Sequence, residues 1–149
     1  MLDRVAELPQ QCQAAWDLAK KIDLSPTYGQ AQHVVILGMG GSAIGGALLA
    51  GLVAPTCALP ITVVRGYQLP AFVQGDAYLV VGCSYSGNTE ETLAAFGEAQ
   101  TRGAQTLAIT TGGRLAEMAA HVVEFAYASQ PRAALGYSFT VLLGVLAQI

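Results

Sequence analysis

The sequence predicts a doubly wound α/β domain of three layers, flavodoxin-like or Rossmann-like, with a five-stranded parallel sheet and helices on both faces. Two observations support this fold class. Short apolar runs, typical of strands buried on both faces, alternate with helical patterns along the chain. The 149 residues are 53% hydrophobic and only 11% charged. This composition excludes intrinsic disorder and suits one domain with a large core.

An amphipathic helix is expected at the start of the chain. Pro9 fits its first turn, and apolar residues recur at helical spacing (Cys12, Ala15, Trp16, Ala19 and Ile22). Asp17 and two lysines lie on the opposite side of the helical pattern. We expect this helix to pack as an N-terminal arm.

Strands and helices are then expected to alternate. The apolar runs predict strands at His33–Leu37, Ile61–Val64, Tyr78–Cys83, Thr106–Ile109 and Val122–Phe125. Helices are expected at Ala43–Val53, Thr89–Arg102 and Leu115–Ala120, and a last one from Pro131. Asn88 is the expected N-cap of the second of these helices, which Gly103 ends. Strands separated in this way form parallel pairs with right-handed crossovers.

Charge and cysteine content limit which classes of partner and which cellular compartment are expected. The net charge is -3 and the seven Lys and Arg residues are scattered, so no nucleic-acid footprint is expected. Three cysteines at wide spacing predict reduced thiols in the cytoplasm and no zinc site. Residues 31–64 carry no charge, but glycines and prolines interrupt them, so no membrane partner is expected. So few charges also predict an apolar face that meets another domain or subunit.

The first candidate site is the glycine loop after the first strand. Gly38-Met39-Gly40-Gly41-Ser42-Ala43 fits the pattern G-x-G-x-x-G/A, in which the backbone approaches an anionic ligand closely. A dinucleotide site would also need an acidic residue near the end of the second strand. Arg65 stands there instead. NAD is therefore disfavoured, and an NADP-binding Rossmann domain is left as an alternative.

The second candidate site is the loop Ser84-Tyr85-Ser86-Gly87-Asn88-Thr89. Three hydroxyls and free backbone N–H groups meet at the start of a helix, where they can hold a phosphate dianion. No Lys or Arg stands in the loop, and the Gly-Lys-Ser/Thr of a nucleotide-hydrolysing loop is missing. An ordinary turn that caps a helix is the alternative.

Both loops would meet if the first and third strands were neighbours. Open α/β sheets bind ligands at the point where the chain reverses direction across the sheet. One ligand could then contact the first loop with its body and the second with its phosphate. The residues concerned are Gly40, Gly41 and Ser42 for the body, and Ser84, Ser86 and Thr89 for the phosphate.

Three segments together resemble the sugar isomerase (SIS) domain of the bifunctional phosphoglucose/phosphomannose isomerases. They are Gly38–Ser42, Ser84–Thr92 and Pro131–Tyr137. The resemblance implies an aldose-ketose isomerase that interconverts glucose 6-phosphate or mannose 6-phosphate with fructose 6-phosphate, without a metal or organic cofactor. It implies that Ser84, Ser86 and Thr89 hold the phosphate of the hexose and that Gly40, Gly41 and Ser42 contact the sugar.

The same resemblance implies a catalytic role for Arg132, at the carboxyl edge of the sheet. Moving a proton between C1 and C2 places negative charge on oxygen, and a fixed guanidinium stabilises that charge in the transition state. The alternative is a surface residue behind a helix-starting proline. Cys83 and the two histidines, His33 and His121, are expected to be structural.

Members of this family have two SIS domains. The resemblance implies that the carboxylate base, the ring-opening histidine and a further lysine lie in the part that follows residue 149. We therefore expect residues 1–149 to form a single SIS domain with an N-terminal helical arm, the N-terminal half of a longer protein. The expected partners are a phosphorylated hexose, the second SIS domain and a second copy in a homodimer. A non-catalytic phosphosugar sensor is the alternative.

Overall fold

A computed structural model describes residues 6–127 and 133–149 and shows one five-stranded sheet. The strand order is β2-β1-β3-β4-β5, and every pair is parallel. The strands are β1 (His33–Leu37), β2 (Ile61–Val64), β3 (Tyr78–Ser84), β4 (Gln105–Thr110) and β5 (Val122–Glu124). The chain reverses direction across the sheet between β1 and β3, so the expected doubly wound fold is confirmed.

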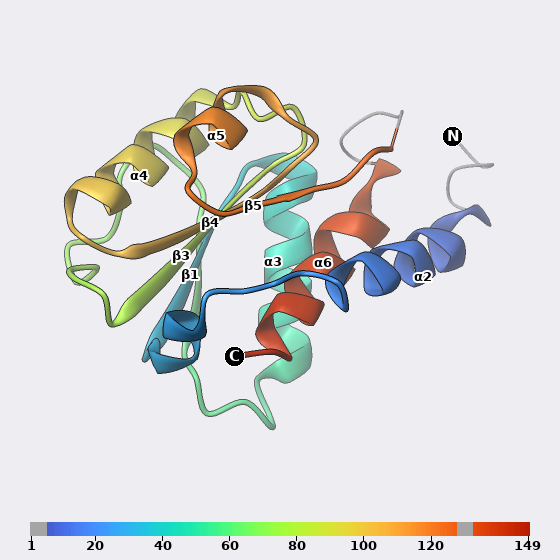
Figure 1. Ribbon diagram of the computed structural model, residues 1–149, viewed down its shortest axis with the longest axis horizontal. Coiled ribbons are helices and arrows are strands. Elements are labelled where there is room, and N and C mark those ends of the chain that lie inside the picture. The colour runs from blue at the N-terminus through green and yellow to red at the C-terminus, as the bar shows by residue number, and fades with distance from the viewer. Residues whose placement is uncertain (1–5, 128–132) are drawn as a thin grey trace.

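Helices cover both faces of the sheet (Figure 1). The helices α4 (Glu90–Thr101) and α5 (Gly113–Met118) lie on one face. The helices α3 (Gly40–Val53) and α6 (Leu135–Leu146) lie on the other. Outside them, α2 (Leu8–Ala19) packs mainly on α6, and a 3-10 turn, η1 (Pro26–Gln30), leads into β1. Three layers result, with α2 as an additional arm.

The strands β1 and β2 have the expected bounds, and the other elements shift by a few residues at their ends. The helix α3 begins at Gly40, three residues before the expected start. Thr89, not Asn88, is the N-cap of α4, so that prediction was wrong. The Asn88 side chain instead donates to the carbonyl of Ser86 and accepts from the N–H of Arg114. Pro131 lies outside the described residues.

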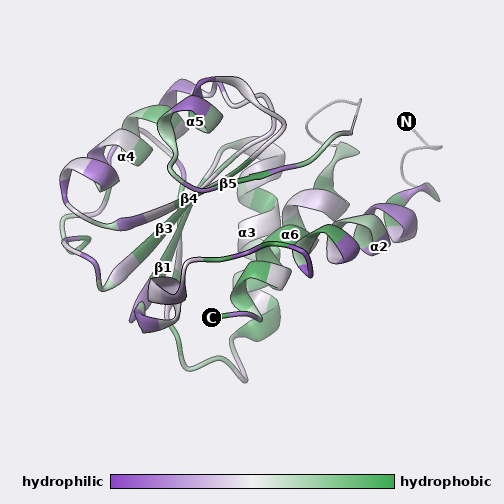
Figure 2. Cartoon of the chain, viewed as in Figure 1, coloured by the Kyte–Doolittle hydropathy of each residue, from purple (hydrophilic) through white to green (hydrophobic). Residues whose placement is uncertain are grey.

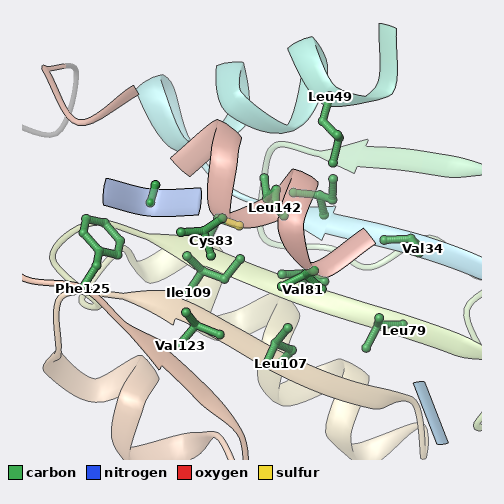
Figure 3. Packing of buried hydrophobic residues seen from close by; sticks show 14 of the residues in the cluster. Val34, Leu49, Leu79, Val81, Cys83, Leu107, Ile109, Val123, Phe125 and Leu142 are labelled. Carbon is green, nitrogen blue, oxygen red and sulfur yellow. The ribbon is translucent and has the colours of Figure 1, made fainter. Parts of the chain in front are cut away.

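The central strands β1, β3 and β4 divide their side chains between two cores. Val34 and Ile36 of β1 belong to the cluster under α3 and α6, and Val35 and Leu37 to the cluster under α4 and α5. Figure 3 shows the first cluster, in which Leu49 of α3 and Leu142 of α6 approach the sheet. Phe96 of α4 fills the second, over Gly82. Both faces of every central strand are therefore dry, as the continuous apolar runs predicted.

The contact between α2 and α6 is very close because α6 presents glycines. A Cβ added at Gly144 would lie 2.3 Å from the Cβ of Ala19, and one at Gly136 would lie 2.6 Å from the Cβ of Gln11. Ala15 and Ala19 are buried as expected, but Trp16 is 38% exposed and Gln11 is buried in its place. The buried face of α2 is therefore rotated from the expected one, toward the side that faces the α6 glycines.

The helix α3 carries apolar and weakly polar residues along its length (Figure 2), and three of its large apolar side chains are exposed. Ile44, Leu48 and Leu52 recur every four residues on one side of the helix and are 47%, 48% and 58% exposed. The apolar face that the composition predicted is thus present on α3. Among the described residues, no helix combines the length and apolarity needed to cross a bilayer.

Candidate functional site

The two glycine loops lie side by side at the carboxyl edge of the sheet. Leu37, the last residue of β1, pairs with Gly82 of β3. A Cβ added at Gly38 would lie 3.1 Å from the carbonyl oxygen of Cys83, so the first loop passes directly over the end of β3. Ser42 and Ser84 line the same small cavity. The juxtaposition expected for neighbouring first and third strands is therefore present.

The second loop is held by its own hydroxyl groups. Ser84 is 3% exposed, and its Oγ lies 2.9 Å from the Oγ1 of Thr89 and accepts a 3.1 Å hydrogen bond from the N–H of Gly87. The Oγ of Ser86 accepts a 3.2 Å bond from the N–H of Asn88. Two of the three predicted hydroxyls thus touch each other, and Ser86 stands at the exposed tip of the loop.

A second segment, Thr110–Gly113 after β4, closes over this loop. The carbonyl of Tyr85 accepts hydrogen bonds from both the N–H and the hydroxyl of Thr111, and the N–H of Leu115 donates to the carbonyl of Gly87. Gly87 has φ +66°, and a Cβ there would lie only 1.8 Å from the carbonyl oxygen of Gly112. Only glycine fits. This segment was not predicted from the sequence, although Thr-Thr-Gly-Gly at the end of a strand is a turn signal.

The first turn of α4 keeps its amides available. The first bond within the helix runs from the N–H of Leu93 to the carbonyl of Thr89. The N–H groups of residues 90–92 precede that bond and have no acceptor within the helix. Thr89 makes no side-chain capping bond, because its hydroxyl faces Ser84. Amides and hydroxyls therefore gather where the helix dipole favours an anion.

The hydrogen-bond donors of the site are uncharged, while Glu90 and Glu91 stand in the adjacent first turn of α4. No Lys or Arg occurs between residues 84 and 89, so the donors are hydroxyls and amides. The thiol of Cys83 is 2% exposed, and burial raises its pKa to about 12. It stays protonated near neutral pH and is no nucleophile. This agrees with the expected role of Cys83 as a packed strand residue.

The cavity between the two loops is small. It measures about 10 Å³, about the space of one water molecule. Ser42 from the first loop, Ser84 from the second and Ser138 from α6 supply its hydroxyls. Pockets that enclose a small ligand are on the order of 300 Å³ or more. The described residues around this cavity therefore do not by themselves enclose a small ligand.

The two histidines lie at the other edge of the sheet. His33 opens β1, where its Nε2 lies 2.8 Å from the hydroxyl of Thr62 and its ring stacks on Phe72. Burial lowers the pKa of His33. His121 precedes β5 and meets the ring of Tyr28 edge-on. Both are remote from the glycine loops, which follow the carboxyl ends of the strands.

The remaining predicted residues are placed as follows. Gly40 and Gly41 begin α3, and Gly40 is exposed with φ +50°. Ser42 follows them at the cavity wall. Arg132 lies outside the described residues. Within the described ranges, no cluster of His, Cys, Asp and Glu has the composition of a metal site.

Comparisons with known proteins find related sequences. A sequence model of the SIS domain family matches residues 28–148. The chain is 46% identical to a bifunctional phosphoglucose/phosphomannose isomerase of Caldicellulosiruptor bescii, over 100% of this chain and 45% of that protein. It is 43% identical to the protein of the same description from Thermoplasma acidophilum, over 78% of this chain and 36% of that one. The chain thus spans less than half the length of these curated relatives.

Solved structures share the fold. The crystal structure of tagatose-6-phosphate ketose/aldose isomerase from Escherichia coli matches with a TM-score of 0.73. The match covers 97% of this chain and 47% of that chain, at 20% identity. At this identity the likeness concerns the arrangement of strands and helices alone.

Proposed function

The chain belongs to the SIS domain family, and from this premise we propose that it is the phosphosugar-binding domain of an aldose-ketose isomerase. The substrates would be glucose 6-phosphate and mannose 6-phosphate, each interconverted with fructose 6-phosphate through an enediolate. The proposal rests on one observation. The hydroxyls of Ser84 and Thr89 lie together at the free amides of α4, beside the glycine loop that follows β1.

In this proposal the loop Ser84–Thr89 holds the phosphate. A dianion gains from the α4 dipole and from hydroxyl donors without needing a cationic side chain. The hydroxyl of Ser86 stands at the exposed tip, where it accepts a bond from the N–H of Asn88 and would donate its proton to the phosphate. Gly40, Gly41 and Ser42 would then contact the sugar, because the first loop lies beside the end of β3. The phosphate thereby fixes the position of C1 and C2 above the carboxyl edge of the sheet.

Arg132 would stabilise the enediolate that forms when the proton moves between C1 and C2. A guanidinium placed at that oxygen interacts more strongly with the transition state than with the neutral substrate. The base that moves the proton and the group that opens the sugar ring would come from the rest of the full-length protein. The scheme requires no metal or organic cofactor.

The full-length protein would contain a second SIS domain, and residues 1–149 would be its N-terminal domain. Relatives about twice as long as this chain support this assignment. The small cavity supports it too, because a further wall is needed to enclose a sugar. We assign the exposed face of α3, at Ile44, Leu48 and Leu52, to contact with that second domain. We also propose that the full-length protein forms a homodimer. Its free thiols support a cytoplasmic location.

Calorimetric titration with fructose 6-phosphate tests the phosphate site. Ser86→Ala and Thr89→Ala should each weaken binding by about 1 to 3 kcal/mol, because each removes a hydrogen bond to a charged group. Ser25→Ala is a matched control, since Ser25 and Thr27 form a similar exposed hydroxyl pair at the opposite edge of the sheet. Unchanged affinity in both loop variants would remove these residues from the site.

Activity separates the domain from the whole protein. The purified chain of 149 residues should bind fructose 6-phosphate but show no measurable isomerisation, because it lacks the base. The full-length protein should turn over both aldose phosphates. Robust turnover by residues 1–149 alone would contradict the proposal that the catalytic base lies outside this domain.

A further inference from the structure

Gln11 of α2 is a polar side chain in a place where packing alone would favour an apolar one. It is 3% exposed. Its Nε2 donates to the hydroxyl of Tyr127 and to the carbonyl of Ala133, both at 2.9 Å, and its Oε1 accepts a 3.2 Å bond from the N–H of Gly136. A buried amide is costly unless it is bonded in this way. Gln11 therefore ties α2 to the segments on either side of residues 128–132.

Tyr127 carries this connection onward to the phosphate-binding loop. Its hydroxyl accepts from Gln11 and donates to the carboxylate of Glu7 at 2.9 Å. Its carbonyl accepts a hydrogen bond from the hydroxyl of Tyr85, which stands between Ser84 and Ser86 in the loop. Tyr127, which follows β5, is thus bonded through its side chain to α2 and through its backbone to the loop.

The ring of Tyr85 and that of Tyr127 are also joined through two further aromatic side chains. Tyr85 meets Phe125 edge-on at 6.2 Å, Phe125 stacks on Tyr137 at 5.1 Å, and Tyr137 lies 5.2 Å from Tyr127. On the far side, the carbonyl of Tyr85 is held by Thr111. The middle of the loop is therefore fixed from both flanks, by the β4 end on one side and by Tyr127 on the other.

Close packing of α2 on α6 does not require these bonds. Gly144 of α6 already allows close contact with Ala19, about two turns along α2 from Gln11. At the other end of the same interface, Gln148 donates to the carbonyls of Ala19 and Gly144 at 2.9 and 3.0 Å. Gln148 thus also joins α2 to the end of α6, but within residues 6–127 and 133–149 no bond leads from it to the loop. The two glutamines differ in that respect.

We propose that Gln11 and Tyr127 are positioning residues, which hold the loop Ser84–Thr89 in its anion-binding geometry from the N-terminal helix. This inference rests on the proposed function, because it deepens the role of that loop. A binding site held within a fraction of an ångström by such outer contacts retains affinity that a loosely held one loses. The helix α2 then contributes to ligand binding as well as to the packing of the fold.

The test compares Gln11→Ala, Tyr127→Phe and the control Gln148→Ala, all in the 149-residue chain. Calorimetry at a temperature where every variant is folded gives the affinity for fructose 6-phosphate and for inorganic phosphate. Gln11→Ala and Tyr127→Phe should each weaken the binding of both ligands about 3- to 10-fold, which is the effect of losing one ordinary hydrogen bond. Gln148→Ala should stay within about 2-fold of the parent, even though it too removes a contact between α2 and α6.

A second measurement needs no ligand. Amide hydrogen exchange at Gly87 and Asn88, whose N–H groups are bonded inside the loop, should accelerate in Tyr127→Phe and not in Gln148→Ala. The double variant of Gln11 and Tyr127 should match the worse single variant, because both act through one path. If Gln11→Ala does not fold, Tyr127→Phe carries the test alone.

The outcomes separate the two proposals. If the parent chain binds fructose 6-phosphate and Gln11→Ala and Tyr127→Phe bind it as tightly as the parent does, the positioning role is wrong while the proposed function stands. If the parent does not bind, the proposed function fails, and the exchange experiment alone decides whether α2 holds the loop. Equal exchange in Tyr127→Phe and Gln148→Ala would then overturn the inference.

Discussion

The loop after β1 and the loop after β3 both lead from a buried strand into a helix, but they are held in different ways. The second loop is fixed by the hydroxyls of Ser84 and Ser86 and by the segment after β4. In the first loop, Gly40 has open space around it. The comparison teaches that the loop after β3 is fixed by its own contacts, whereas the loop after β1 leaves its backbone open to close approach by another group.

The helices that follow continue this contrast. The first turn of α4 carries Glu90 and Glu91, and its last turn is tied down through Glu98 and Arg102. The helix α3 has no charged residue and exposes apolar side chains. The charged residues of α4 suit contact with water, whereas the exposed apolar side chains of α3 suit contact with protein.

The largest expected effect comes from adding a methyl group to each loop. Gly87→Ala should destabilise the chain by roughly 3 kcal/mol or more, because the Cβ would collide with the Gly112 carbonyl at a left-handed backbone position. Gly40→Ala should cost only about 1 to 2 kcal/mol, since its φ of +50° is unfavourable but the space is open. Urea unfolding of both variants measures the difference. Equal losses would show that both loops are fixed alike.

Removing a hydroxyl should give the next largest effect. Ser84→Ala should lower the free energy of unfolding by about 0.5 to 1.5 kcal/mol, because the hydroxyl bonds to Thr89 and to the N–H of Gly87 are lost, although that N–H keeps the carbonyl of Ser84 as an acceptor. Ser42→Ala, in the first loop, should change it by less than about 0.5 kcal/mol. Thermal unfolding followed by circular dichroism measures both. A larger loss in Ser42→Ala than in Ser84→Ala would reverse the comparison.

The smallest expected effect concerns pH and the charged end of α4. The N–H of Leu69 and the nearby Arg102 hold the pKa of Glu98 below its usual value of 4.5. A group with a lowered pKa in the folded state adds stability above about pH 4.5, which is lost as the pH falls through its folded pKa. Glu98→Gln should therefore be less stable than the parent at pH 7.

The gap between the two proteins should close toward pH 3. Unfolding with urea at several pH values measures it, and Asp23→Asn is a control on an exposed acidic side chain outside α4. A gap that stays constant with pH would mean that the charge of Glu98 contributes nothing and that only its contacts matter.

The fold could be predicted because strand signals are local. The runs at His33–Leu37 and Ile61–Val64 contain only residues that suit a buried strand, apart from the terminal His33 and from Thr62, and their bounds are the observed ones. The start of α3 was placed too late, because Gly40 and Gly41 are poor helix formers in isolation. In the fold, packing against the sheet and α6 outweighs that preference.

The site was predicted in part. Glycine and hydroxyl residues directly after strands are visible in the sequence, and strand order alone then brings Ser42 and Ser84 to one cavity. Gln11 and Thr111 were not found, because each acts on residues far away in the chain. A polar residue within an amphipathic pattern is expected to face solvent, and the glycines of α6 together with the bonds to Tyr127 and Ala133 explain why Gln11 is inside.

The glycines of α6 have a consequence for mutational libraries of this domain. Any side chain at position 144 would occupy the volume of the Ala19 methyl group. A library randomised at Gly136 and Gly144 should therefore return glycine in almost every folded clone. Randomising Gly51, which also lies in a helix but has open space around it, should instead yield many amino acids.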